Sequence, residues 1–273
     1  MNNINEKEFT FWDHLEELRK VLFRILIIVA VVTIFAFICK DLLFDIILAP
    51  HRSDFIIYRA LCSLSDLISF PAICPQEFHV ELINTQLASQ FLIHMSMSFY
   101  MGILIAFPYI IYQLFRFVSP ALRENEKKYS KRVIVWSSLL FMAGVLLNYF
   151  IIFPLSFRFL ATYQVNNEVI NIINLSSYTD TLLMLSLMLG IMSELPVLSW
   201  LLAKLGFLTH SFMKKYRKHA VVIILVLAAV ITPTTDIFTL MLVFAPIYLL
   251  YEISISIVKR VIKKKNLKEE LVQ

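Results

Sequence analysis

The chain alternates long apolar runs with short charged loops. The apolar runs lie at about residues 21–39, 85–107, 133–153, 181–202, 220–231 and 238–258. Because an apolar helix needs about 20 residues to cross the hydrocarbon core of a bilayer, most of these runs predict transmembrane helices. The fifth run is short, since its residues at about 1.5 Å each reach only about 18 Å. We therefore predict an all-α membrane protein with six transmembrane helices.

The segments beside these runs predict how the helices begin and end. The residues before the first run are amphipathic, which indicates a short interfacial helix that leads into the first span. Pro108 predicts a kink after the second span, and Pro154 predicts the end of the third span. The long connection between about residues 40 and 84 contains three prolines and short apolar pieces. We expect short helices there that form an outer cap over the bundle.

The composition agrees with a membrane protein and excludes several other classes. The chain is 59% hydrophobic and 16% charged, whereas soluble domains are about 45–50% apolar and about 25% charged. It has no phosphate-binding loop of the type G-x-x-x-x-G-K-[ST], and its His and Cys residues lack metal-ligand spacing. We therefore expect no enzyme activity, no cofactor and no metal. The net charge of +5 comes from residues beside the spans, where they meet anionic lipid rather than nucleic acid.

The distribution of lysine and arginine predicts the orientation. If both termini are cytoplasmic, 21 of the 25 Lys and Arg residues fall on the cytoplasmic side. Only Lys40, Arg52, Arg59 and Arg158 remain for the other side. Cytoplasmic loops carry the excess of basic residues in membrane proteins, so both termini should lie inside the cell. Residues 259–273 would then form a basic cytoplasmic tail, which we expect to fray.

Glu194 interrupts the fourth span. A charged side chain at the centre of a membrane helix costs about 3 kcal/mol or more. Two interpretations remain open: a neutral acid that bonds a neighbouring helix, or a contact or proton site beside a wet cavity. Ser186 and Gly190 precede Glu194 at intervals of four residues and share its helical stripe. We expect the three residues to line a hydrated, thinned concavity where the transmembrane helix of a partner docks.

A second polar stripe lies in the second span. Gln86, Gln90, His94 and Ser98 follow one another at intervals of four residues. They either make hydrogen bonds between helices or line a cavity, and the sequence does not decide between these roles. A proton-coupled small-molecule transporter that uses Glu194 and His94 is one alternative function, although no convincing internal repeat supports it. A structural membrane scaffold is another.

Two of the three cysteines fall in the predicted outer cap. Cys62 and Cys74 lie on the oxidising side of the membrane, where a disulfide between them would brace the cap. Two free thiols are the alternative. Cys39 lies at the end of the first span.

Four motifs resemble those of one known family. They are HLEELRK at residues 14–20, FVSPALRENEKK at 117–128, SELP at 193–196 and TPTTD at 232–236. Their order among six apolar runs resembles the TatC family, the large polytopic subunit of the twin-arginine protein translocase. The resemblance covers nearly the whole chain. It implies a curved, glove-like bundle.

The resemblance also implies roles for individual residues. Glu17 and Glu126 match the acids that receive the twin-arginine signal peptide. Arg19, Phe117 and Pro120 match other positions of the same site, Pro50 matches a proline after the first span, Glu194 matches a membrane-embedded acid, and Asp236 matches an acid before the last span. The TPTTD segment departs from the usual TPPD pattern by one extra residue, which makes the assignment of Asp236 less direct.

The function that the resemblance implies is that of a receptor. It would bind signal peptides of folded cargo proteins at the inner membrane of a bacterium and nucleate an export complex driven by the proton-motive force. TatA-type single-span subunits and further copies of the chain would be its partners, and the sequence leaves open whether a separate TatB-type subunit exists. The chemistry agrees, because carboxylates bind planar guanidinium groups through paired, charge-assisted hydrogen bonds.

Overall fold

The computed structural model describes residues 11–68, 80–118, 130–164, 166, 171–232 and 236–270. Within these ranges, five helical segments are long and apolar enough to cross a membrane: His14–Ile38, Ser89–Val118, Lys131–Thr162, Leu175–Leu205 and Ile237–Lys264. They correspond to five of the six predicted spans. The fold is therefore helical and has several membrane-spanning segments, as the apolar pattern predicts.

The first two long helices form an antiparallel pair. Helix α1 (Phe11–Ile38) is continuous, so the predicted interfacial segment is simply its beginning. Helix α4 (Ser89–Val118) continues through Pro108 to the end of the described segment. A Cβ on Gly102 of α4 would clash with Thr33 of α1, because the two backbones approach closely there.

The predicted cap consists of short elements between α1 and α4. These are α2 (Lys40–Leu48), the 3-10 helix η1 (Ala49–His51), and α3 (Ile56–Ile68). The buried Tyr58 of α3 fixes the cap to the bundle, since its hydroxyl donates to the carbonyl oxygen of Pro154 at 2.9 Å. Burial raises the pKa of Tyr58, against the opposing effect of Arg158, so the phenol remains a hydrogen-bond donor. The helical cap agrees with the sequence prediction.

A small parallel strand pair joins the cap to a distant loop. Strand β1 (Leu82–Ile83) pairs with β2 (Ile173–Asn174), with Leu82 opposite Ile173 and Ile83 opposite Asn174. The Asn174 side chain adds a hydrogen bond from Nδ2 to the Thr85 hydroxyl at 2.9 Å. The all-α prediction missed this pair, which is too short to leave a pattern in the sequence.

The third span corrects the prediction that Pro154 ends it. Helix α6 (Ser130–Leu147) passes into a π-helix, η4 (Asn148–Ile152), and then into α7 (Phe153–Thr162). In a regular α-helix the ring of Pro154 would clash with the carbonyl four residues earlier. The wider π turn directly before the proline changes that register, so the helix continues to Thr162.

The remaining helices complete the bundle. Helices α8 (Leu175–Met192) and α9 (Leu195–Leu205) form the fourth span, which breaks at Ser193 and Glu194. They are followed by α10 (His210–Lys215), α11 (Arg217–Ile231) and α12 (Ile237–Glu270). Because α12 is helical as far as Glu270, the expectation of a frayed tail from residue 259 was wrong up to that point.

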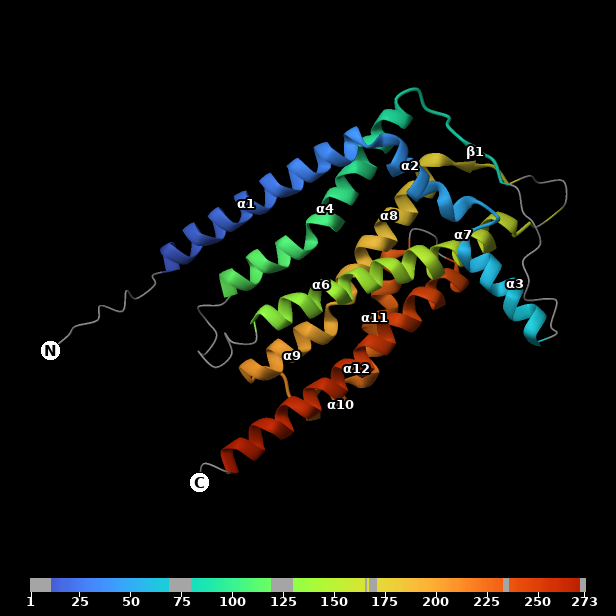
Figure 1. The fold of residues 1–273 in the computed structure, drawn as a ribbon. Coiled ribbons are helices and arrows are strands. Elements are labelled where there is room, and N and C mark those ends of the chain that lie inside the picture. The colour runs from blue at the N-terminus through green and yellow to red at the C-terminus, as the bar shows by residue number, and fades with distance from the viewer. Residues whose placement is uncertain are drawn as a thin grey trace.

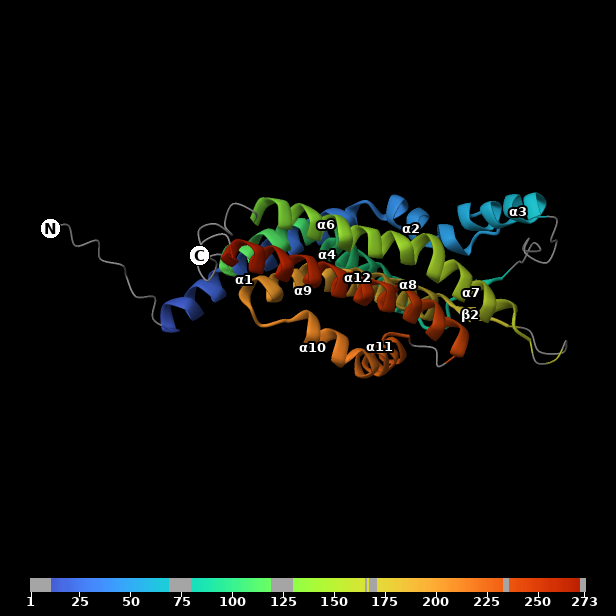
Figure 2. The same ribbon diagram turned by 90° about the horizontal axis from the view of Figure 1, so that it is seen from below.

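The arrangement gathers the helix ends into two groups. Figure 1 shows the beginning of α1 and the ends of α4, α9 and α12 at one end of the molecule, and α2, α3 and β1 at the other. Figure 2 shows α10 and α11 on one side of the layer formed by the other long helices. The main core lies between α7, α8 and α12, where Phe153, Leu185 and Ile247 are almost completely buried.

Candidate functional site

The beginning of α1 meets the end of α4 at the end of the molecule where both termini of the bundle lie. The imidazole of His14 stacks on the ring of Phe117, with centroids 4.2 Å apart and planes at 20°. Farther along the same antiparallel pair, Phe37 of α1 stacks on His94 of α4. In both contacts the two residue numbers add to 131, so the two helices keep the same register at both points. In this register Glu17 faces the stretch of α4 around residue 114, within one turn of Phe117. The register thus brings together the segments of α1 and α4 that carry Glu17 and Phe117.

The surroundings of this pair are mixed in charge. Glu17 and Phe117 are half-buried, whereas Arg19 and Arg116 are exposed. The Arg19 guanidinium lies 5.6 Å from the ring centroid of Phe23, so this side chain lies along the surface of α1. Glu16 pairs with Lys20 at 2.8 Å. Glu126 and Pro120, the other two predicted residues of the site, lie outside the described residues.

Two residues of this region were not singled out by sequence reasoning. His14 belongs to the motif HLEELRK, but only the structure shows its contact with Phe117. Gln113 of α4 is 3% exposed, and its Nε2 donates to the Tyr109 hydroxyl at 2.6 Å. The spacing of four residues between Tyr109 and Gln113 is the only signal in the sequence that could have suggested this bond.

Glu194 lies at the break between α8 and α9, as the N-cap residue of α9. The Ser137 hydroxyl of α6 donates to Glu194 Oε2 at 2.5 Å. Among the residues that the structure describes, no group makes a hydrogen bond to the buried Oε1. The carboxyl group is therefore held from one side only and keeps an acceptor for a further donor.

The two residues that share the stripe of Glu194 take part in helix packing. Ser186 is 5% exposed, and its hydroxyl accepts a hydrogen bond from Asn148 Nδ2 at 2.8 Å. Gly190 is also buried, and a Cβ there would lie 2.7 Å from Cε2 of Phe141. Of the three residues, only Glu194 is partly exposed.

His94 and Gln90 occupy different surroundings although they share a stripe. His94 is buried and stacks on Phe37 with centroids 4.0 Å apart, whereas Gln90 is exposed. His94 lies 24 residues before the end of α4, or about 36 Å at the helical rise of 1.5 Å per residue. Ser137, the partner of Glu194, lies seven residues into α6, or about 10 Å from its start. His94 and Glu194 are thus near opposite ends of the bundle, which argues against a direct proton relay between them.

The other predicted residues have clear local roles. Pro50 is buried in η1. Asp236 caps α12, because its Oδ2 accepts the backbone N–H of Thr239 at 2.7 Å. Cys62 is disulfide-bonded and Cys39 is free. Cys74 lies outside the described residues, so its pairing with Cys62 stays a prediction.

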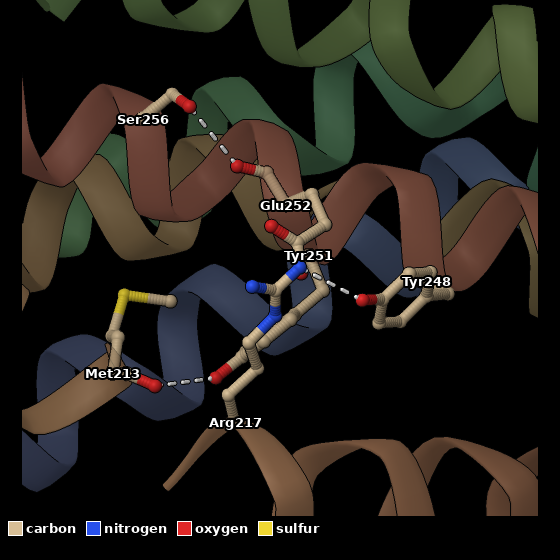
Figure 3. Close-up of polar contacts among 6 residues, drawn as sticks. All are labelled: Met213, Arg217, Tyr248, Tyr251, Glu252 and Ser256. Carbon is tan, nitrogen blue, oxygen red and sulfur yellow. Dashed lines mark hydrogen bonds and ion pairs between the residues drawn. The ribbon is translucent and has the colours of Figure 1, made fainter. Parts of the chain in front are cut away.

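A further polar cluster ties α11 to α12. Figure 3 shows the guanidinium of Arg217 between Tyr248 and Glu252. Arg217 Nη2 lies 2.6 Å from Glu252 Oε1 and donates to the Tyr248 hydroxyl at 3.0 Å. The Tyr251 hydroxyl donates to the carbonyl oxygen of Met213 at 3.0 Å and so attaches α10 to the same face of α12.

Comparison with known proteins gives a consistent result. Residues 13–246 match the family model for the Sec-independent protein translocase protein (TatC). The chain is 38% identical to the TatC protein of Blattabacterium sp. subsp. Periplaneta americana (strain BPLAN), over 96% of this chain and 99% of that protein. It is 30% identical to the TatC protein of Carboxydothermus hydrogenoformans, over 94% and 95% of the two chains.

A solved structure agrees with these relatives. The crystal structure described as the twin-arginine translocase receptor TatC superposes with a TM-score of 0.73 at 32% identity. The match covers 91% of this chain and 99% of the other. Together with the contact between the HLEELRK segment and Phe117, these matches confirm the resemblance seen in the motifs, and the chain belongs to the TatC family of Sec-independent protein translocase proteins.

Proposed function

We propose that this chain is the receptor and core subunit of a twin-arginine protein translocase, and that Glu17 and Phe117 form part of its signal-peptide site. The observation that carries the proposal is the stacking of His14 on Phe117, which places the Glu17 segment of α1 at the end of α4. A carboxylate beside an aromatic ring suits a guanidinium, since the ion can bond the acid and stack on the ring. Glu126 and Pro120, which follow α4 in the sequence, would complete the site.

The orientation follows from charge. The end of the molecule that carries the His14–Phe117 contact also carries the basic segment around α10 and the basic end of α12. We assign this end to the cytoplasm and α2, α3 and the strand pair to the opposite side, in the inner membrane of a bacterium. With α11 as a short fifth span, six crossings then give a bundle with both termini inside, and the glove-like curvature is part of the same proposal.

Glu194 would act after peptide binding, when partner subunits assemble with this chain. Its carboxyl group is held by Ser137, yet Oε1 has no hydrogen-bond partner in the described part of the chain. Polar groups in a membrane bind one another strongly enough to favour one docking geometry over others. We assign to Glu194 the contact with a TatA-type or TatB-type single-span subunit, after which the assembled complex, with further copies of this chain, uses the proton-motive force. Ser186 and Gly190 would support this contact by packing α8.

Peptide binding tests the receptor function directly. The full chain in lipid nanodiscs is titrated with a labelled signal peptide that carries Arg-Arg, and with the same peptide carrying Lys-Lys. We expect the Arg-Arg peptide to bind more tightly. Glu17→Gln should weaken its binding by about tenfold or more, because a hydrogen bond to a charged group contributes about 1.5–3 kcal/mol.

The neighbouring acid supplies a matched control. Glu16 is exposed and pairs with Lys20 on the same helix, so Glu16→Gln should leave peptide affinity within about twofold of the wild type. Equal affinity of the wild-type chain for the two peptides would contradict the proposed function.

A further inference from the structure

The stacked contact between His14 and Phe117 lies at the surface of the bundle and not in its core. Stacked aromatic pairs commonly stabilise a buried core, but His14 is exposed and Phe117 is only half-buried. The centroid separation of 4.2 Å and the interplanar angle of 20° describe a nearly parallel stack at the mouth of the α1–α4 pair. Because the contact is at the surface, it contributes less to the stability of the fold than a core pair does, and its clearest effect is on the orientation of the Phe117 ring.

That orientation matters for the side chains that lie next to it. Glu17 follows His14 by three residues and therefore lies on the same face of α1, with Cβ atoms about 5–6 Å apart. The stack thus holds the ring of Phe117 close to the side of α1 that carries the Glu17 carboxylate. A planar guanidinium gains from both groups at once, since it bonds a carboxylate in its plane and stacks on a ring through its face. An ammonium group is compact and strongly hydrated, and it gains mainly from the charge of the acid.

We propose that His14 is a positioning residue of the peptide site, which by stacking on Phe117 fixes the ring for a guanidinium and so favours arginine over lysine in the bound peptide. The inference rests on the proposed receptor function and extends it to the source of selectivity. Glu17 and His14 then have separate tasks: the acid contributes affinity for any cation, and the stacked ring contributes the preference for a planar one.

The experiment compares three variants with the wild-type chain in nanodiscs, with the Arg-Arg and Lys-Lys peptides as probes. His14→Ala should weaken binding of the Arg-Arg peptide by about threefold to tenfold, as expected for the loss of one oriented aromatic contact, and binding of the Lys-Lys peptide by less. His14→Tyr keeps a ring that can stack on Phe117 and should restore the ratio of the two affinities. His219→Ala is the matched control, because His219 is also exposed and lies beside an aromatic ring, that of Tyr216, at 5.5 Å.

The ratio of affinities separates positioning from simple structural damage. A misfolded or loosened site would lose both peptides by the same factor, so a His14→Ala variant with an unchanged ratio would overturn the inference. Unchanged affinity of His14→Ala for the Arg-Arg peptide would overturn it as well, while leaving the receptor function intact. Failure of the wild-type chain to prefer Arg-Arg would overturn both proposals.

Discussion

Gly190 offers a quantitative test of how α8 packs in the bundle. The Cβ of an alanine at this position would lie 2.7 Å from Cε2 of Phe141 and 3.0 Å from Cδ2 and Cζ. The ring cannot easily move away, because Phe141 has no exposed surface and stacks on Phe107 with centroids 3.3 Å apart. Overpacking of this kind costs about 1–3 kcal/mol. We therefore expect Gly190→Ala to lower the free energy of unfolding by about that amount.

Thermal unfolding of the purified protein in detergent measures the effect. A loss of 1 kcal/mol lowers Tm by roughly 2–4 °C for chains of about this size, so Gly190→Ala should lower Tm by roughly 2–12 °C. Phe141→Leu removes the part of the ring that the new methyl group meets. The double variant should therefore lose less stability than the sum of the two single variants, by about 0.5 kcal/mol or more. An unchanged Tm for Gly190→Ala, or strict additivity in the double variant, would refute the packing argument. Either result would instead favour the prediction that Gly190 lines a hydrated concavity.

Three further predictions concern the site, the cap and the membrane acid. Glu126→Ala should abolish recognition of the Arg-Arg peptide without loss of protein from the membrane, because an acid in a segment rich in charged residues is expected to contribute little to stability; normal affinity in this variant would exclude Glu126 from the site. Mass spectrometry of the alkylated, non-reduced protein should show a peptide that links Cys62 to Cys74, and full alkylation of both thiols before reduction would refute this linkage. Glu194→Ala should spare peptide binding but reduce co-purification of a TatA-type subunit with the chain, with Glu194→Gln milder if hydrogen bonding is the role and equally severe if a proton must move; co-purification at the wild-type level in both variants would refute the partner contact.

Hydropathy was sufficient to predict the long helices, because each must bury its backbone in lipid and does so with an apolar surface. Local exceptions were harder to predict. Pro154 is a helix breaker by its own chemistry, yet the π turn from Asn148 to Ile152 accommodates it. Asn148 is completely buried, and its Nδ2 bonds both the Leu182 carbonyl and Ser186 across the interface with α8. Such a register change depends on a neighbouring helix, which no local pattern reveals.

For the candidate site, too, the motifs predicted which residues belong together but not which of them are in contact. The resemblance assigned Glu17 and Phe117 to one site from their motifs, but their proximity depends on how α1 and α4 pair, and residue types alone do not supply that register. His14 was therefore missed although it stands in one of the four motifs that carry the resemblance. Ser186 and Gly190 lie one turn apart in α8, whereas Glu194 lies at the break that follows α8. Their spacing does not say which face of α8 is covered, and the structure covers the first two residues with α6 and its π-helical extension.

Helix α11, the proposed fifth span, is short, and its start is attached to α12. Helix α11 has 15 residues, which reach only about 22 Å against a hydrocarbon core of about 30 Å. Its start is fixed by the ion pair between Arg217 and Glu252 at 2.6 Å. Glu252 lies seven residues before Lys259, the first basic residue at the end of α12, and therefore about 10 Å deeper along the helix. With α11 as the proposed fifth span, its polar start would lie inside the level of the basic residues of α12, and the bilayer would have to thin or admit water there. A Tyr248 hydroxyl that bonds the same guanidinium makes this polar level more favourable. The short apolar run was visible in the sequence, but the ion pair joins residues 35 positions apart, so only the folded chain shows that the start of α11 is attached to Glu252 of α12.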